Sequence, residues 1–147
     1  MLLSEAIVFV VDDDPGVRKL ITTLLTLQGY RVETFASAQE LLELDENQVC
    51  ECLILDVQLP GLNGLELQQR LLHKGESPPI VFITGYGDIP RTVQAMKAGA
   101  VDFLPKPFTE EALLNAVQLA LDRSRREEMV KSGLAKIRER LATLTGR

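Results

Sequence analysis

Ile7-Val8-Phe9-Val10-Val11-Asp12-Asp13-Asp14-Pro15 is the stretch of sequence that decides the fold (residues 7–15). Its unbroken apolar run is typical of a parallel strand that is buried on both faces. Asp14 suits the N-cap of a helix, and Pro15 suits the first helical position. The stretch therefore predicts a buried strand, an acidic strand end and the start of a helix.

Four more short apolar runs follow, and an amphipathic stretch comes after each of them. They are residues 31–35, 53–56, 80–84 and 101–104. Strict alternation of strands and helices at this length predicts a doubly wound α/β fold, with five parallel strands joined by right-handed crossovers. Residues 31–35 alternate between polar and apolar side chains, so we expect them to form an edge strand.

Signals for the starts and ends of helices lie between these runs. Ser37 with Glu40, and Asn63 with Glu66, have the spacing of a capping box. Thr109 precedes two acidic residues, which suit the first turn of a helix. Three glycines are placed to end helices: Gly29, Gly75 and Gly99. Together with Pro15, these signals predict five helices.

The charge of the 147-residue chain is distributed unevenly. Residues 1–121 carry 17 acidic and 8 basic side chains, whereas residues 122–147 carry 4 acidic and 8 basic ones. We therefore predict one domain over residues 1–122 and an extended C-terminal linker helix over residues 123–147. The acidic body argues against a nucleic-acid surface on the domain itself.

Other features exclude several classes of protein. No apolar run is long enough to span a membrane, and the N-terminus does not resemble a signal peptide, so we expect a cytoplasmic protein without a membrane partner. Cys50 and Cys52 have neither the redox nor the usual zinc spacing. His73 is the only histidine and falls in the last turn of a predicted helix, which disfavours a histidine-based catalytic centre.

Polar residues gather where the predicted strands end. Asp12 and Asp13 follow the first strand, Asp56 ends the third, Thr84 ends the fourth and Lys106 follows the fifth. The carboxyl ends of parallel strands share one edge, so these side chains should converge there. Two carboxylates about 4 Å apart repel by roughly 4 kcal/mol at an effective dielectric near 20. We therefore expect positive charge between them, from Lys106 and from a hard divalent cation such as Mg²⁺.

Such a site suits phosphoryl transfer. Asp56 stands alone at a strand end and is the best candidate for a nucleophile that forms an acyl phosphate. The cation and Lys106 would neutralise the phosphoryl oxygens, and the Thr84 hydroxyl would donate a hydrogen bond to them. Asp14 is assigned to helix capping rather than to the cation.

Four segments of the chain resemble the receiver domains of two-component response regulators, over residues 6 to about 122. They are Val10-Val11-Asp12-Asp13-Asp14-Pro15, Leu55-Asp56-Val57-Gln58-Leu59-Pro60-Gly61, Ile83-Thr84-Gly85 and Leu104-Pro105-Lys106-Pro107-Phe108. The resemblance implies a flavodoxin-like sheet of order 2-1-3-4-5. It also implies a signalling switch that a sensor histidine kinase phosphorylates, rather than an enzyme, with at most self-catalysed phosphorylation and dephosphorylation.

The resemblance also implies roles for the metal-site residues. Asp13 would bind Mg²⁺ directly and Asp12 largely through water. Asp56 would accept the phosphoryl group and also bind the metal, and the backbone carbonyl of Gln58 would complete the protein ligands.

Further roles implied by the resemblance concern the switch. Thr84 and Lys106 would hold the phosphoryl oxygens. Phe103 lies at the family's switch aromatic and would move together with Thr84. The Lys106-Pro107 peptide bond matches one that the family holds in the cis form.

The C-terminal tail predicts the output. Apolar residues recur with 4-3-4-3 spacing, which suits a coiled-coil seam or a docking helix: Val130, Leu134, Ile137, Leu141 and Leu144. Residues 139–147 resemble the linker to a LuxR-type DNA-binding domain in FixJ-type transcription regulators. We therefore expect contact with DNA only through an output domain that this chain lacks.

The resemblance further implies a homodimer that forms on phosphorylation. The expected face consists of the helix over residues 89–98, the fifth strand and the start of the last helix. The side chains assigned to it are Val93, Met96, Lys97, Val101 and Leu113.

Two other functions fit parts of the sequence. Asp12-x-Asp14 resembles the start of a haloacid-dehalogenase phosphatase motif, but Gly16 stands where that family has Thr or Val. A flavin- or nucleotide-binding module on the same sheet needs a glycine- or hydroxyl-rich loop after the first strand, and this chain has three aspartates there. Turnover of a phosphate ester, or a tightly bound flavin or nucleotide, would support these alternatives.

Overall fold

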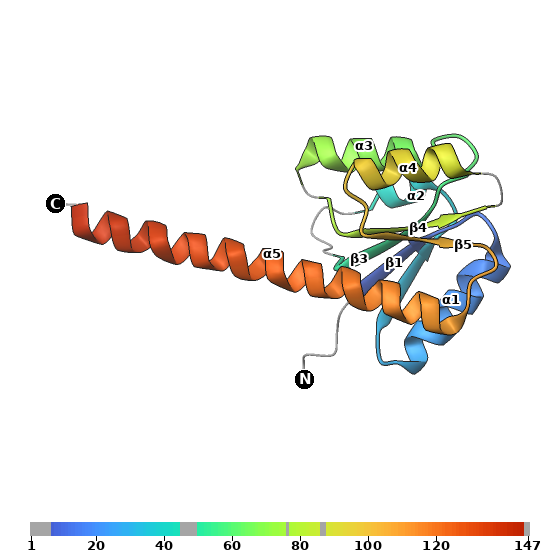
Figure 1. Ribbon diagram of the computed structural model, residues 1–147, viewed down its shortest axis with the longest axis horizontal. Helices are drawn as coiled ribbons and strands as arrows, with labels where there is room; N and C mark the ends of the chain where they lie inside the picture. Colours follow the sequence, from blue (N-terminus) through green and yellow to red (C-terminus); the bar gives the residue numbers. More distant parts are fainter. Residues whose placement is uncertain (1–6, 45–49, 76, 86–87, 146–147) are drawn as a thin grey trace.

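The computed structural model describes residues 7–44, 50–75, 77–85 and 88–145, with side chains as far as Glu127 and at Met129 and Val130. Within these residues, five parallel strands form one sheet with helices on both faces (Figure 1). The strand order is β2-β1-β3-β4-β5. The predicted doubly wound, flavodoxin-like fold is confirmed.

The strands lie close to their predicted positions. They are β1 (Ile7–Val11), β2 (Arg31–Phe35), β3 (Cys52–Asp56), β4 (Ile80–Thr84) and β5 (Asp102–Pro105). β3 and β4 are buried over their whole length, whereas β2 lies at an edge of the sheet, as predicted. Three boundaries differ from the prediction by one residue. β3 begins one residue earlier, where Cys52 pairs with Val8, and β5 is shifted by one residue at both ends, so that Pro105 pairs with Thr84.

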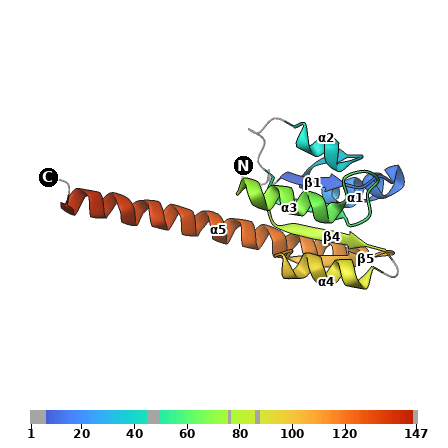
Figure 2. The same ribbon diagram turned by 90° about the horizontal axis from the view of Figure 1, so that it is seen from above.

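Helices cover both faces of the sheet and create two cores. They are α1 (Pro15–Leu27), α2 (Ala38–Leu42), α3 (Gly64–Lys74), α4 (Ile89–Lys97) and α5 (Glu110–Thr145). α1 and α5 lie on one face, and α2, α3 and α4 lie on the other (Figures 1 and 2). Ile21 and Leu113 belong to the core of the first face, and Leu67 and Ala95 belong to that of the second.

The predicted starts of α1, α3 and α5 are confirmed. Asp14 accepts a hydrogen bond from the Gly16 amide at 2.8 Å. Asn63 and Glu66 form a reciprocal capping box, and the Thr109 hydroxyl accepts from the amide of Ala112. The glycines expected to end helices all have positive φ angles: Gly29, Gly75 and Gly99. Local sequence therefore explains where most of the helices begin and end.

The starts of α2 and α4 differ from this pattern. The Ser37 hydroxyl accepts from the Glu40 amide, but the Glu40 carboxylate accepts from the amide of Ala36 rather than that of Ser37. The capping box predicted for α2 is therefore only half formed. Asp88 stands at the N-cap of α4, and its side chain accepts no capping hydrogen bond from the first turn.

α5 packs on the sheet at its start and then projects beyond the domain (Figure 1). Leu113 and Val117 are wholly buried, whereas Met129 and Val130 are 73% and 61% exposed. The apolar positions predicted beyond Val130 lie outside the described side chains. No helix in the described parts of the chain is long and apolar enough to cross a membrane.

Candidate functional site

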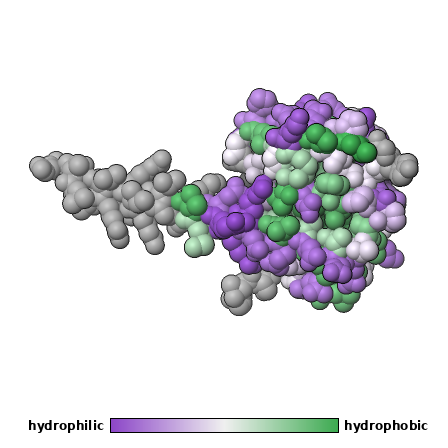
Figure 3. All heavy atoms as spheres, viewed as in Figure 1, coloured by the Kyte–Doolittle hydropathy of each residue, from purple (hydrophilic) through white to green (hydrophobic). Residues whose placement is uncertain are grey.

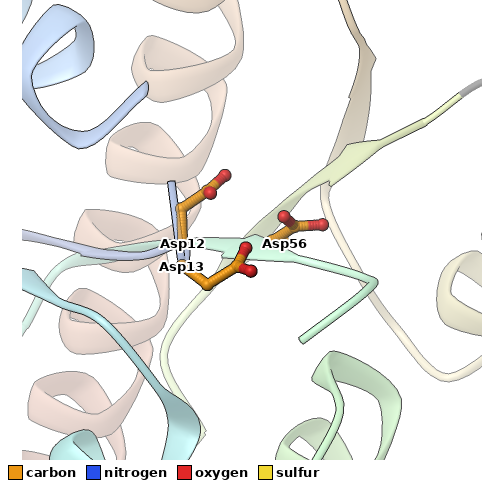
Figure 4. Close-up of side chains that lie close together, drawn as sticks. All are labelled: Asp12, Asp13 and Asp56. Atoms are coloured by element: carbon orange, nitrogen blue, oxygen red, sulfur yellow. The ribbon is translucent and has the colours of Figure 1, made fainter. Parts of the chain in front are cut away.

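Three acids meet at the carboxyl edge of the sheet. Asp12 and Asp13 follow β1, and Asp56 is the last residue of β3. Figure 4 shows the three side chains gathered in one place, and an oxygen of each carboxylate lies within 4.8 Å of the others. The predicted convergence of these acids is present because β1 and β3 are parallel neighbours.

The two acids after β1 have different environments. Asp12 is wholly buried, whereas Asp13 is exposed. Oδ1 of Asp12 accepts from the Asp14 amide at 2.9 Å. Oδ2 of Asp12 is buried without a hydrogen-bond partner in the described residues, although it lies 3.4 Å from Nζ of Lys106. A buried carboxylate oxygen without a hydrogen bond lowers stability, and a bound cation would offset that cost.

Asp56 is 4% exposed and holds a partner on each oxygen. Oδ1 accepts from the Gln58 amide at 2.9 Å, and Oδ2 accepts from Nζ of Lys106 at 3.2 Å. Burial raises the pKa of Asp56 to about 6, and the negative charge of Asp12 adds to the rise, while the Gln58 amide and Lys106 oppose it. Asp56 is therefore mainly ionised at neutral pH, in a place that disfavours its charge.

Lys106 supplies the only described cation in direct contact with the buried carboxylates of Asp12 and Asp56. Burial lowers the pKa of Lys106, but the charges of Asp56 and Asp12 outweigh that effect and raise it overall. The backbone of Lys106 also donates to the Thr84 carbonyl at 2.8 Å, which joins the ends of β4 and β5. The Lys106-Pro107 bond is cis, as the resemblance implied.

The donor set fits a hard divalent cation. Three carboxylates face one ammonium group, so the cluster keeps an excess of negative charge. Carboxylate oxygens are the ligands that Mg²⁺ prefers, and the unpartnered oxygen of Asp12 is available to it directly or through water. The structure shows the amide and side chain of Gln58 in hydrogen bonds; the role of its carbonyl stays a prediction.

The two residues predicted to act as a switch, Thr84 and Phe103, lie on neighbouring strands. Thr84 is 3% exposed, whereas Phe103 is 40% exposed. Both line a mainly apolar groove of about 810 Å³ beside α4. Phe103 therefore points outward next to a space near Thr84, and its predicted inward movement stays a prediction.

Sequence reasoning missed two residues that shape the site. A Cβ atom at Gly64 would collide with the carbonyl oxygen of Asp56, so only glycine lets α3 approach the end of β3 this closely. Asp88 is 8% exposed and accepts from the side chain of Gln58 and the amide of Gly85. Asp88-Ile89-Pro90 signals a helix start, but nothing local shows that the carboxylate turns toward the site.

The cysteines take no part in this chemistry. Cys50 precedes β3, Cys52 begins it, and both are free. Burial raises the pKa of Cys50 to about 12 and also raises that of Cys52. Because the thiolate is the reactive form, these protonated thiols are poor nucleophiles. The carboxylate cluster is therefore the candidate site for the chemistry.

A five-stranded, doubly wound sheet with an acidic crevice and a lysine at its carboxyl edge defines a class of α/β signalling domains. The chain belongs to the response regulator receiver family. A profile of the response regulator receiver domain matches residues 8–118.

Relatives of known name agree with this assignment. Nodulation protein W of Bradyrhizobium diazoefficiens is 46% identical over 144 residues, which cover 98% of this chain and 63% of that protein. Transcriptional regulatory protein FixJ of Azorhizobium caulinodans is 37% identical over 140 residues, which cover 95% of this chain and 66% of that protein. The chain thus spans less than two thirds of the length of these relatives.

Solved structures are similar over most of the chain. The response regulator StyR superposes with a TM-score of 0.85 at 45% identity, covering 97% of this chain and 72% of that one. FixJ-N superposes with a TM-score of 0.75 at 37% identity, covering 80% and 94%. The chain is therefore a receiver domain of two-component signalling, related to transcriptional regulators.

Proposed function

We propose that this chain is a phosphorylation-driven switch in which Asp56 accepts a phosphoryl group from a sensor histidine kinase in a Mg²⁺-dependent reaction. The observation that carries this proposal is the convergence of Asp12, Asp13 and Asp56 within 4.8 Å, with Lys106 3.2 Å from Asp56. Two of these three acids are buried, and the mutual repulsion of buried carboxylates is costly without a cation.

The described residues have clear tasks in such a transfer. An oxygen of Asp56 forms a bond to phosphorus while the bond from phosphorus to the donor's histidine nitrogen breaks. Lys106 and the Thr84 hydroxyl donate hydrogen bonds to the phosphoryl oxygens. Mg²⁺ held by Asp12, Asp13, Asp56 and the Gln58 carbonyl would supply neutralisation of the remaining charge. The product is an acyl phosphate on Asp56, so the chain acts as a switch rather than a turnover enzyme.

Intact mass measured after incubation with Mg²⁺ and acetyl phosphate tests the proposal. We expect the mass of one added phosphoryl group, which Asp56→Asn or chelation abolishes and Asp13→Asn reduces. Asp14→Asn is the matched control: Asp14 caps α1, and asparagine caps a helix equally well. Labelling that survives Asp56→Asn overturns the assignment, and turnover of a phosphate ester would favour a phosphatase.

Phosphorylation would change the surface formed by α4, β5 and α5. Val93, Phe103 and Leu119 are 46%, 40% and 50% exposed there, and Figure 3 shows apolar side chains over this face. If Thr84 follows the phosphoryl group, Phe103 gains room to turn into the groove beside α4. Such a face suits a modest, reversible homodimer. Leu113 was wrongly assigned to it: the side chain faces the sheet and is wholly buried.

Sedimentation with and without the phosphate mimic beryllofluoride tests this output. We expect a monomer that dimerises when the mimic binds, and we expect Val93→Glu to prevent dimerisation. Leu20→Glu is the control, because Leu20 is 49% exposed on α1, away from this face. A monomer in both states would contradict the dimer.

The extended helix α5 would pass this change to an output domain. We place the receiver over residues 1–122 and a linker helix over residues 123–147, and we propose that DNA is bound only through a domain beyond them. The matched part covers only 63% of nodulation protein W, so that relative is considerably longer. We place the reaction in the cytoplasm. Specific DNA binding by these 147 residues, measured by mobility shift, would refute the division of roles.

A further inference from the structure

Asp88 occupies a helix N-cap without capping the helix. The N-cap residues Asp14, Ser37 and Asn63 have extended backbones, and their side chains bond to the first turns of α1, α2 and α3. Asp88 instead has φ −92° and ψ 28° and makes no such bond to α4. A capping side chain normally stabilises the start of its helix. Some other contact must therefore hold the Asp88 side chain.

The Asp88 carboxylate bridges two loops at the phosphoacceptor edge. Its Oδ1 accepts from Nε2 of Gln58 at 3.1 Å, and its Oδ2 accepts from the Gly85 amide at 3.3 Å. A guanidinium nitrogen of Arg91 lies 3.9 Å from Oδ1. The residue is 8% exposed, so these contacts are largely shielded from water.

Both bridged residues neighbour groups that must meet the phosphoryl group. The amide of Gln58 donates to Oδ1 of Asp56 at 2.9 Å. Gly85 directly follows Thr84, the hydroxyl donor at the end of β4. The bridge therefore ties the segment after Asp56 and the segment after Thr84 to the start of α4.

The same carboxylate has a second possible partner. An N-cap side chain accepts from the second or third residue of its helix, and Pro90, the second residue of α4, has no N–H. The amide of Arg91, the third residue, is the remaining choice. The carboxylate can thus bridge Gln58 and Gly85, or it can cap α4 by accepting from the Arg91 amide. In the exchange, the hydrogen bonds from Gln58 and Gly85 are lost and one from the Arg91 amide is gained.

We propose that Asp88 is a positioning residue that restrains phosphorylation: it bridges Gln58 and Gly85 in the free protein and moves to the Arg91 amide when Thr84 and Gly85 close on a phosphoryl group. This inference rests on the proposed function of Asp56. Removing the bridge then favours the closed arrangement. Loss of a hydrogen bond of this kind should lower the apparent dissociation constant of a phosphoryl mimic roughly two- to twelve-fold.

Beryllofluoride titrations in Mg²⁺ test the bridge. Asp88→Ser introduces a hydroxyl that can cap α4 but is too short to hold the bridge. Gln58→Met removes the side-chain amide that donates to Asp88 and keeps the backbone. Each variant should bind beryllofluoride about two- to twelve-fold more tightly than the parent. The double variant should match Asp88→Ser, because both changes break the same bridge. Asn63→Ser, a cap exchange on α3, and Gln69→Met, on the exposed side of α3, should behave like the parent.

Amide hydrogen exchange distinguishes repositioning from simple loosening. In the parent, the Arg91 amide should exchange more slowly once beryllofluoride binds, and Asp88→Ala should lack this protection. Unchanged or weaker beryllofluoride binding in Asp88→Ser and Gln58→Met, or an Arg91 amide indifferent to the mimic, overturns the inference while leaving Asp56 as the acceptor. A parent that does not bind beryllofluoride in Mg²⁺ overturns the proposed function itself, and this inference with it.

Discussion

β3 contains two kinds of buried position side by side. Leu55 is wholly buried in an apolar core, and Asp56, the next residue, is 4% exposed at the carboxyl edge. Burial stabilises the leucine by removing apolar surface from water. The same burial raises the pKa of Asp56 to about 6, because it disfavours the charged carboxylate. The interior of the sheet thus provides stability, and the buried charge at its carboxyl edge reduces it.

β1 repeats the contrast. Val11 and Asp12 are both wholly buried, and only Asp12 leaves an oxygen without a hydrogen-bond partner in the described residues. Lys106 offsets part of the cost by contacting both Asp12 and Asp56. Substitution of a buried apolar residue in the interior and neutralisation of Asp56 at the edge should therefore change stability in opposite directions.

The largest effect is expected in the interior. Leu55→Ala should lower the free energy of unfolding by about 2–5 kcal/mol, because it removes buried methyl groups and leaves a cavity between strands and helices. Urea denaturation measures the change. Leu20→Ala is the control, since Leu20 is 49% exposed on α1 and should change the value by about 0.5 kcal/mol or less. A loss below about 1 kcal/mol at Leu55 would contradict the assignment of stability to the interior.

Much of this boundary could be predicted from the sequence. Asp12, Asp56 and Lys106 are far apart in the chain, yet parallel strands place their ends on one edge, so their meeting followed from the alternation of strands and helices. The edge position of β2 followed from its polar alternation. These features depend on hydrophobic periodicity and on the direction of the strands, and short segments of sequence are enough to predict both.

Other features depend on tertiary contacts that local sequence does not record. Asp14 and Asp88 both precede a helix with an early proline, but only Asp14 caps its helix, because Gln58 and Gly85 compete for Asp88. Leu113 was expected on a helix and is on one, but the direction of its side chain depends on how α5 packs on the sheet. The orientation of these side chains therefore depends on contacts between secondary-structure elements and not on the sequence of a single element.

A smaller effect of opposite sign is expected at the carboxyl edge. Asp56→Asn should raise the free energy of unfolding by about 1–2 kcal/mol at pH 8 without Mg²⁺, after allowance for solvent screening of the charge. The pKa of Asp56 is raised from 3.8 to about 6 on folding, so the ionised side chain costs stability above pH 6. That cost disappears as the pH falls toward 3.8. The advantage of the variant should therefore shrink between pH 8 and pH 5.

Urea denaturation of both proteins at pH 8 and pH 5 measures this difference, and Asp102→Asn, on the half-exposed side of β5, is a control for a change of charge alone. Added Mg²⁺ should stabilise the parent more than the variant, because a ligand stabilises only the state that binds it. A variant that is less stable than the parent at pH 8 without Mg²⁺ would show that Asp56 contributes to stability instead of reducing it.

The smallest effect is expected at Lys106. Its pKa is raised on folding, so its contribution to stability is fully present at pH 7 and is lost only as the pH rises above the ordinary lysine value of 10.5. Lys106→Met keeps the alkyl chain and removes the charge. We expect the free energy of unfolding at pH 7 without Mg²⁺ to fall by about 0.5–1 kcal/mol, since the ammonium is partly exposed and its ion pairs are screened.

The loss should be smaller in an Asp56→Asn background, because one of the two carboxylates that Lys106 neutralises is then uncharged. The double-mutant cycle isolates that ion pair, and a carboxyl NMR titration should show the pKa of Asp56 above 6 in Lys106→Met, since Lys106 lowers it in the parent. Lys19→Met, on the exposed side of α1, is the matched control. Equal losses in both backgrounds, with an unchanged pKa of Asp56, would mean that Lys106 does not offset the charge of Asp56. Its contact with Asp12 would then account for its effect on stability.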